Sequence, residues 1–140
     1  MEIIEIRTRT TEGLGTLSFL ESKKDIPFEI KRIYYTYNVD EGLQRGGHAH
    51  KNLIQLLFCP YGSIEVTIDN GFSKEKIILD SPNKGLIIEN GIWRNMIWKM
   101  KNSVLCVAAS EYYNEQDYIR DYDEFLKYVK EGYWNNENKI

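Results

Sequence analysis

The sequence has no apolar run near the ~18 residues that a membrane-spanning helix requires, and charges at Glu2, Glu5, Arg7 and Arg9 replace the apolar core of a secretory signal. It has only two cysteines, and both lie inside apolar stretches, which is typical of buried side chains and argues against a disulfide framework or a zinc cluster. A net charge of -3 argues against an overall basic surface for nucleic acid. These features predict a cytoplasmic protein with neither membrane nor nucleic-acid partners.

The 140 residues have room for one domain. Short apolar or alternating runs separated by turn residues recur from Ile3 to Ala109, and this pattern is typical of a β-sandwich or barrel. The run at 64–68 alternates strictly and leads into Asp69-Asn70-Gly71, which predicts a hairpin with a type I′ turn. The expected strands are 16–20, 30–39, 53–59, 64–68, 76–79, 86–88, 92–98 and 104–109.

The pattern changes after Tyr113, where apolar residues recur at spacings of three and four. Asn114 is a suitable N-cap and Gly132 a suitable stop, so we expect one amphipathic helix at 114–131 that packs on the β body. The domain is therefore expected to span 1–133. The Asn-rich segment 134–140 is expected to be a flexible tail.

Both histidines of the protein lie in the segment RGGHAHK at 45–51. In an extended strand His48 and His50 point to the same face about 6.5 to 7 Å apart, and this arrangement is typical of a site. Gly46 shares their parity, so we expect its missing side chain to leave room for a ligand. Imidazoles with an ordinary pKa near ~6.5 are suited to proton transfer at neutral pH.

A polar face on the expected strand 30–39 predicts further site residues. Arg32, Tyr34 and Thr36 share one face of this strand, although alternation alone leaves open whether they meet solvent or the barrel interior. In the interior, cationic side chains would bind a pyrophosphate, and a tryptophan would offer a surface on which a base could stack. The candidate substrate-binding residues are Arg32, Arg45, Lys51, Gln55, Trp93 and Arg94.

Five residues between positions 42 and 62 have the spacing of a known motif, namely Gly42, His48, His50, Gln55 and Gly62. They resemble the first motif of the cupin superfamily, in which a metal-binding Glu commonly stands at the position of Gln55. The resemblance implies a mainly β, single-domain cupin (double-stranded β-helix or jelly-roll) barrel, here with a C-terminal α-helix.

The second cupin motif matches less well, because Arg94 stands where a histidine ligand would be. Gln55 is a neutral and weaker ligand than Glu, and a guanidinium has no lone pair to donate. A metal ion would also be repelled by the Arg94 cation in a cavity of low dielectric. We therefore expect a cupin without a metal and without another cofactor, and iron dioxygenase chemistry is disfavoured.

Longer stretches resemble a narrower family, the sugar 3,4-ketoisomerases of the FdtA and QdtA type (WxcM-like cupins), which act on dTDP-4-keto-6-deoxyglucose. The matching stretches, in the order of the family, are IPF at 26–28, IKRIYY at 30–35, RGGHAHK at 45–51, LDSP at 79–82, ASEYY at 109–113 and DYIRDY at 117–122.

This resemblance implies that the ketone of the nucleotide-linked sugar moves from C4 to C3 through an enediol, ahead of an aminotransferase that makes a 3-amino-3,6-dideoxyhexose (Qui3N or Fuc3N). We expect His48 to be the base, His50 to orient it or relay protons between the two oxygens, and Tyr34 to be a polar partner. Arg94 is expected to stabilise the enediolate. The assignment of the base to His48 rather than to His50 is open.

The product configuration at C4 is open as well. Some family members carry His at the position of Arg94 and an Arg near the position of Leu14, so the cation at Arg94 favours the gluco product, in a quinovose pathway. The resemblance also implies a homodimer, which could exchange an N-terminal strand, and ten tyrosines agree with an aromatic interface.

Three rival functions remain at this point. A 3,5-epimerase of dTDP-4-keto sugars has a similar barrel, but such chains are usually longer and lack the paired histidines. A non-catalytic sugar-nucleotide-binding cupin would bind the nucleotide and be indifferent to loss of His48. A metal-dependent cupin oxygenase would lose activity with a chelator.

Overall fold

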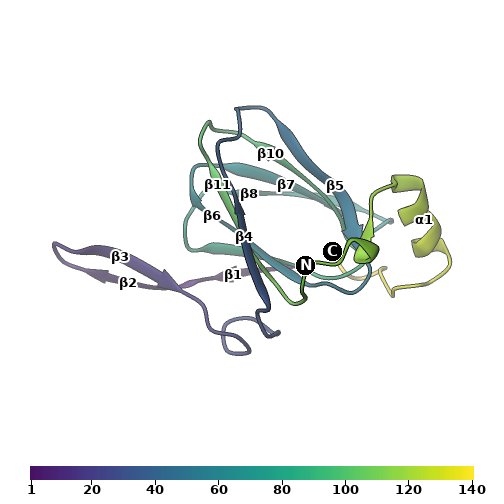
Figure 1. The fold of residues 1–140 in the computed structure, drawn as a ribbon, viewed down its shortest axis with the longest axis horizontal. Coiled ribbons are helices and arrows are strands. Elements are labelled where there is room, and N and C mark those ends of the chain that lie inside the picture. The colour runs from purple at the N-terminus through teal and green to yellow at the C-terminus, as the bar shows by residue number, and fades with distance from the viewer.

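The computed structural model describes residues 1–140 and is mainly β, with one α-helix near the C-terminus. Two five-stranded sheets face each other in a jelly-roll arrangement (Figure 1), which confirms the predicted fold class. One sheet has the order β1-β9-β6-β11-β4, and the other β12-β5-β10-β7-β8. Their bounds are β1 Glu2–Glu5, β4 Arg32–Thr36, β5 Gln44–His50, β6 Gln55–Tyr61, β7 Ile64–Asp69, β8 Lys74–Leu79, β9 Lys84–Ile88, β10 Trp93–Trp98, β11 Val104–Ala109 and β12 Tyr118–Ile119.

The main apolar core lies between the two sheets, where each strand places every second side chain. On β7, Ile64, Val66 and Ile68 are fully buried and alternate with half-buried residues, as the strict alternation of the sequence predicts. Cys59 is buried and Cys106 is half-buried, and both are free thiols, in agreement with the expectation from their apolar surroundings.

The hairpin between β7 and β8 is confirmed, but its turn differs from the predicted type I′ turn. The last strand pair is Asp69 with Lys74, so four residues connect the strands. The Asn70 side-chain oxygen accepts hydrogen bonds from the backbone N–H groups of Phe72 and Ser73, and only Gly71 has a positive φ. The side chain of Asn70 therefore stabilises a longer turn and leaves its own backbone in an ordinary conformation.

The C-terminal helix is shorter than the predicted segment 114–131: α1 spans Tyr122–Lys130. Asn114 caps only a short 3-10 helix, η1, at Glu115–Asp117, and the chain then extends into β12, which pairs with β5. Asp121 is the true N-cap, because its carboxylate accepts hydrogen bonds from the N–H groups at 123 and 124. Pairing with β5 removes 118–119 from the helix despite their helical spacing.

The segment 134–140 is packed and does not form the expected flexible tail. Trp134 and Asn136 are buried, and the Trp134 indole N–H donates to the Lys51 carbonyl at 2.9 Å. The Asn136 amide donates to the carbonyls of Asn70 and Gly91 at 3.2 and 2.7 Å. The segment therefore holds the ends of three loops together, a long-range role that its polar composition conceals.

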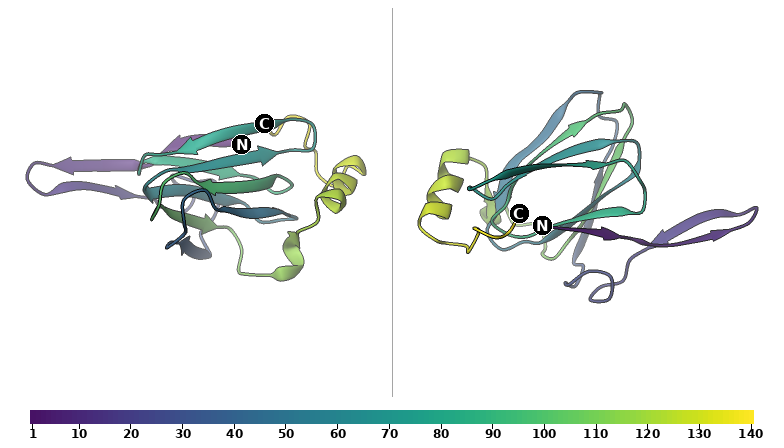
Figure 2. Two further views of the ribbon diagram at one scale, coloured as in Figure 1. Left: turned by 90° about the horizontal axis from the view of Figure 1, so that it is seen from above. Right: turned by 180° about the vertical axis from the view of Figure 1, so that it is seen from behind.

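Strands β2 (Arg7–Thr11) and β3 (Gly15–Phe19) form a hairpin that projects from the barrel at the end opposite α1 (Figures 1 and 2). Every residue of β2 is exposed, and Leu14 and Leu17 are 85% and 62% exposed. We call residues 7–19 the arm. No helix of the structure has the length and apolar character needed to cross a bilayer.

Candidate active site

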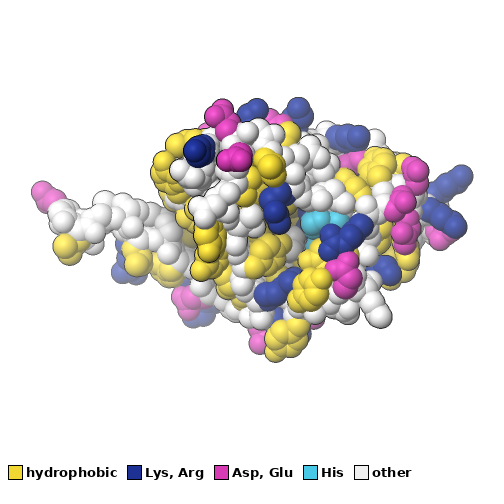
Figure 3. Space-filling model, turned by 45° about the horizontal axis from the view of Figure 1, so that its top comes forward, with side chains coloured by type: hydrophobic (Ala, Val, Ile, Leu, Met, Phe, Trp, Pro, Cys, Tyr) yellow, Lys and Arg dark blue, Asp and Glu magenta, His cyan; other side chains and the backbone are white.

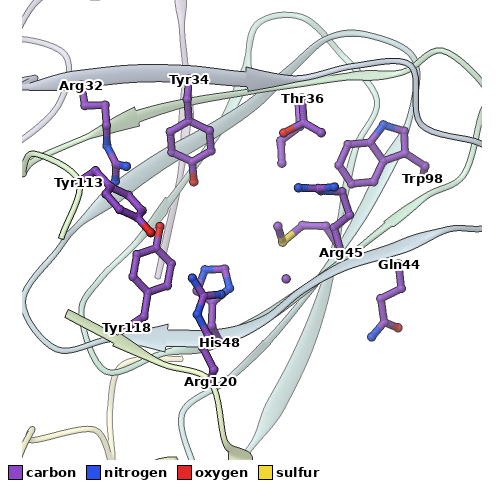
Figure 4. A pocket seen from close by; sticks show the side chains of 13 residues that line it. Arg32, Tyr34, Thr36, Gln44, Arg45, His48, Trp98, Tyr113, Tyr118 and Arg120 are labelled. Carbon is purple, nitrogen blue, oxygen red and sulfur yellow. The ribbon is translucent and has the colours of Figure 1, made fainter. Parts of the chain in front are cut away.

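A pocket of about 500 Å³ opens between the two sheets, and β4, β5, β10, β11 and the segment after β11 supply its walls (Figure 4). The sequence-predicted residues Arg32, Tyr34, Arg45 and His48 all line it. The remaining lining residues are Thr36, Gln44, Gly46, Met96, Trp98, Leu105, Tyr113, Tyr118 and Arg120.

Strand β4 turns its polar face into this pocket. Arg32, Tyr34 and Thr36 line the cavity, whereas Ile33 and Tyr35 are more than half exposed on the outer side. This settles the alternative that alternation left open. β4 is the edge strand next to β11, and by alternation one face of it lines the cavity while the other meets solvent.

His48 and His50 lie side by side on β5, with ring centroids 4.9 Å apart and planes almost perpendicular. His48 lines the pocket, whereas His50 is fully buried and lies behind it. The ring of Tyr118 packs on both imidazoles, at 5.1 Å from His48 and 4.4 Å from His50. The period-two prediction of a shared face is therefore correct, but only one of the two rings meets the open pocket.

Gly46 also lies on the pocket wall, yet the neighbouring strand explains its missing side chain better than a ligand does. Its φ is +95°, and a Cβ there would stand 2.9 Å from the Arg94 carbonyl oxygen and 3.2 Å from the Met96 sulfur. The register between β5 and β10 shifts at this point. Gly46 thus permits the close approach of β10 that places Arg94 opposite His48.

His50 forms a hydrogen-bonded pair with Asp117: its Nδ1 lies 3.0 Å from the Asp117 carboxylate. The other carboxylate oxygen accepts from the Asn52 N–H at 2.8 Å, and the Asp117 carbonyl accepts from the Lys51 N–H at 2.9 Å. His50 Nε2 is buried without a partner. The short helix η1 therefore delivers a carboxylate to the back of the histidine pair.

Burial and nearby cations lower the pKa of both imidazoles. For His48, desolvation and the Arg94 charge lower the pKa from 6.5 to about 3, and the same two causes lower the pKa of His50 further. The expected ordinary pKa near 6.5 is therefore wrong for the free protein. Both rings are neutral at neutral pH, so each offers a lone pair to a proton, although each is a weaker base than a solvated imidazole.

A buried polar chain runs from Arg94 through Gln55 to Tyr34. The Arg94 guanidinium donates to the Gln55 side-chain oxygen and to the Ile92 carbonyl. The Gln55 amide then donates to the Tyr34 hydroxyl oxygen at 2.9 Å. Burial lowers the pKa of Arg94 to about 10 and raises that of Tyr34, so the guanidinium is charged and the phenol neutral at pH 7.

The donor set of this site does not fit a metal ion. Of the four positions that bind metal in cupins, His48 and His50 remain, and Gln55 and Arg94 are tied to each other by a hydrogen bond. The structure has no group of three or more His, Cys, Asp and Glu side chains that could hold an ion. The Arg94 charge would also repel a cation.

Three arginines, Arg32, Arg45 and Arg120, line the pocket. Figure 3 shows dark blue Lys and Arg side chains gathered around a cyan His on this face of the molecule. Two nitrogens of Arg32 are buried without a hydrogen-bond partner, and its guanidinium lies over the rings of Tyr34 and Tyr113. Arg120 stacks on Tyr118 at 4.2 Å and is bonded to Glu115, while Arg45 projects from β5. The arrangement is suited to an anionic ligand with aromatic or sugar surfaces.

Two predicted binding residues lie elsewhere. Trp93 packs on Tyr122 and Phe125 under α1, because on β10 it has the opposite parity to Arg94 and faces away from the pocket. The ammonium of Lys51 lies 5.6 Å from the ring of Tyr128. Lys51 follows the end of β5, where the chain turns toward α1, so neither residue lines the pocket. Gln55 and Arg94 lie in the layer beneath the lining residues.

The pattern analysis did not single out Tyr113, Asp117, Tyr118 and Arg120, which all lie after β11. The last three fall within 114–131, where helical spacing predicted a helix packed on the body. The polar residues at 115–117 and Arg120 interrupt that spacing. This interruption was the available signal that the helix begins later and that 113–120 is extended toward the pocket.

Comparison with known proteins gives a consistent result. The family model FdtA, described as "WxcM-like, C-terminal", matches residues 1–130. A TDP-4-oxo-6-deoxy-alpha-D-glucose-3,4-oxoisomerase from Aneurinibacillus thermoaerophilus is 45% identical over 118 residues, which are 84% of this chain and 85% of the relative.

Solved structures of 3,4-ketoisomerases are also similar to this chain. A 3,4-ketoisomerase from Helicobacter canadensis is 45% identical with a TM-score of 0.89, over 92% of this chain and 96% of that one. A variant of the 3,4-ketoisomerase QdtA from Thermoanaerobacterium thermosaccharolyticum, solved with TDP-4-keto-6-deoxyglucose, is 39% identical with a TM-score of 0.89, over 93% and 94% of the two chains.

Proposed function

Because this chain belongs to the FdtA family of WxcM-like proteins, we propose that it is a 3,4-ketoisomerase of TDP-4-keto-6-deoxyglucose. The observation that carries the proposal is the pair of neutral imidazoles on β5, set beside a buried guanidinium at the base of an arginine-lined pocket. Moving a ketone between neighbouring carbons requires proton removal, stabilisation of an enediolate and proton return. The site provides groups for each of these steps.

His48 is the proposed base, because it is the imidazole that meets the pocket. Its neutral ring accepts the C3 proton, which the C4 ketone acidifies, and returns a proton at C4. An anionic pyrophosphate near Arg32 and Arg45 would offset the positive field of the site and raise the basicity of His48 in the complex. His50 is the proposed relay between the C3 and C4 oxygens.

Tyr34 and Arg94 are proposed to stabilise the enediolate in different ways. The Gln55 amide donates to the Tyr34 oxygen, so the phenolic hydrogen is free to be donated to a sugar oxygen. Arg94 is fully buried beneath the lining residues, so it is proposed to act through its charge. The lowering of both imidazole pKa values by Arg94 supports a field that extends to the reacting groups. Both groups are fixed before the reaction, which makes such stabilisation effective.

The reaction is proposed to need neither a metal nor another cofactor. Support comes from the donor set, in which Gln55 and Arg94 are engaged with each other, and from the ketone itself, which acidifies the C3 proton without a Lewis acid. The nucleotide-linked 4-keto-6-deoxyhexose is the proposed substrate, bound by Arg32 and Arg45 at the pyrophosphate.

The proposed product has the gluco configuration at C4, and a 3-aminotransferase of a quinovose pathway would consume it. The support is the cation at Arg94 together with the absence of one at Leu14. Leu14 lies at the tip of the arm, away from the pocket of its own chain. Only in a homodimer could this position approach a pocket, and the exposed leucines at 14 and 17 support such a dimer.

The test is incubation of the protein with TDP-4-keto-6-deoxyglucose in D₂O with EDTA, followed by proton NMR, beside a His48→Asn variant. We expect a 3-keto sugar that carries solvent deuterium at C4. A parallel reaction in H₂O leaves a proton at C4, and its coupling to H5 reports the C4 configuration. The variant should lose 10²- to 10⁴-fold in rate, the usual contribution of a general base. An unchanged sugar whose lines broaden on binding would instead indicate a binding protein, and inhibition by EDTA would indicate a metal enzyme.

A further inference from the structure

We propose that Asp117 is a positioning residue that fixes the tautomer of His50, so that His50 presents the lone pair of Nε2 to the reacting groups. The inference rests on the proposed function for its kinetic consequence. Its structural part, the tautomer, stands on the geometry alone.

The position of Asp117 is determined by hydrogen bonds on every side. Its N–H donates to the Asn114 carbonyl at 3.0 Å, its carbonyl accepts from Lys51 at 2.9 Å, and one carboxylate oxygen accepts from the Asn52 N–H at 2.8 Å. The second carboxylate oxygen is thereby aimed at His50 Nδ1, 3.0 Å away. The Asp117 side chain is 11% exposed and that of His50 is fully buried. A buried contact held at both ends has little freedom to rearrange.

This contact leaves one tautomer for a neutral ring. A carboxylate only accepts hydrogen bonds, so the hydrogen of His50 must be on Nδ1. The Nε2 atom then has a lone pair, and it is buried with no partner in the protein. An unsatisfied buried acceptor is unfavourable for folding, so the fold retains this arrangement at a cost to stability.

The tautomer matters because it decides what His50 can do beside His48. With the hydrogen on Nδ1, the buried Nε2 can accept a proton that is passed to it from the pocket side and then return it. The carboxylate would stabilise the imidazolium that forms in between. With the hydrogen on Nε2, the ring could only donate there, and the relay could not begin by accepting a proton.

The variant Asp117→Asn reverses this arrangement with little change of shape. The amide oxygen can still accept from the Asn52 N–H, which leaves the amide NH₂ directed at His50 Nδ1. A donor at that point favours the tautomer with the hydrogen on Nε2. The matched control is Asp121→Asn, which removes the same charge four residues along at the N-cap of α1, where Asn is as good a cap as Asp.

The first readout is independent of activity. Long-range ¹H–¹⁵N NMR of the imidazoles should show His50 protonated on Nδ1 in the wild-type protein and in Asp121→Asn, and on Nε2 in Asp117→Asn. A wild-type His50 protonated on Nε2, or an unchanged tautomer in Asp117→Asn, would overturn the positioning role. The same spectra show that the variant is folded.

The second readout is kinetic. We expect Asp117→Asn to lower kcat about 10- to 100-fold with KM within about twofold, as for other residues that orient a functional histidine. In a His50→Asn background the same change should have no further effect, because Asp117 acts through His50. A kcat within twofold of wild type, or full additivity with His50→Asn, would refute the proposal. If no variant or wild-type protein isomerises the sugar while the tautomer readout holds, the proposed function fails and the positioning of His50 does not.

Discussion

At the scale of single residues, the site works through groups that the barrel holds in uncommon states. His48 and His50 are neutral because burial and Arg94 disfavour their charge, and Arg94 remains charged although it is fully buried. A buried guanidinium is tolerated only with hydrogen-bond partners, here Gln55 and the Ile92 carbonyl. Holding the histidines neutral in the folded protein lowers the free energy of unfolding when the unfolded chain can protonate them, so this contribution depends on pH.

The first prediction concerns that pH dependence. The unfolded chain binds a proton on each histidine near pH 6.5, whereas His48 in the folded chain binds one only near pH 3. The unfolded state therefore holds more protons between these values, and the free energy of unfolding falls as the pH falls below about 6.5. Each buried histidine contributes up to about 1.4 kcal/mol per pH unit.

Urea unfolding between pH 7 and 5 measures this slope. The window lies above the ordinary pKa of Asp and Glu side chains, about 4, so the histidines dominate the slope there. A His48→Asn variant should lose about half of the slope. Equal stability of the wild-type protein at pH 7 and pH 5 would show that the histidines are not held neutral.

At the scale of elements, the pairing of β5 with β10 brings His48, His50 and Arg94 together, and Gly46 permits this pairing. Alternation along β5 puts His48 and His50 on one face, and the register sets Arg94 opposite His48. Alternation along β10 likewise explains why Arg94 faces inward and Trp93 faces α1. On both strands, the alternation of side chains alone determines whether a residue faces the barrel interior or packs on the outer side.

The second prediction tests this pairing with Gly46→Ala. A positive φ costs a side chain roughly 1–2 kcal/mol, and the added Cβ would also overlap the Arg94 carbonyl, so we expect a loss of about 2–4 kcal/mol. The displaced β5 should also lower kcat. Gly132→Ala is the control, because Gly132 has a φ of +73° with open space around it and should lose only the backbone contribution. Equal losses in urea unfolding would mean that the strand approach is not tight.

At the scale of the whole molecule, the two ends of the chain have different roles. The arm extends from the barrel, whereas the C-terminal segment folds back on it (Figure 2). Trp134 packs on Phe125 and Tyr128 and bonds to the Lys51 carbonyl, one residue after His50. The C-terminal segment thus supports the strand end that carries the site.

The third prediction follows from that contact. Trp134→Ala should lower the free energy of unfolding by about 3–5 kcal/mol, because it leaves a cavity under α1 and leaves the Lys51 carbonyl with only its hydrogen bond from the Asn90 amide. Asn135→Ala, at the exposed neighbouring position, should be close to wild type. Thermal or urea unfolding distinguishes the two. A Trp134→Ala protein as stable as the Asn135→Ala protein would show that the segment is the flexible tail that its composition indicates.

The sequence by itself determined the β class, most strand positions, the shared face of the two histidines and the replacement of metal ligands by Gln55 and Arg94. These are local properties: alternation depends on neighbouring residues, and ligand chemistry depends on residue type. Alternation also predicted that Arg32, Tyr34 and Thr36 share one face of β4, but it did not predict that this face points into the pocket.

Only the tertiary structure decided which polar residues meet in the pocket. The segment 114–131 was predicted as one helix, yet the pairing of 118–119 with β5 delays the helix and brings Asp117 and Tyr118 to the histidines. The same packing takes Lys51 and Trp93 away from the pocket and buries Trp134. The lowered pKa values of His48 and His50 also depend on the tertiary structure. Desolvation and the field of Arg94 arise from residues distant in sequence, and no local pattern encodes them.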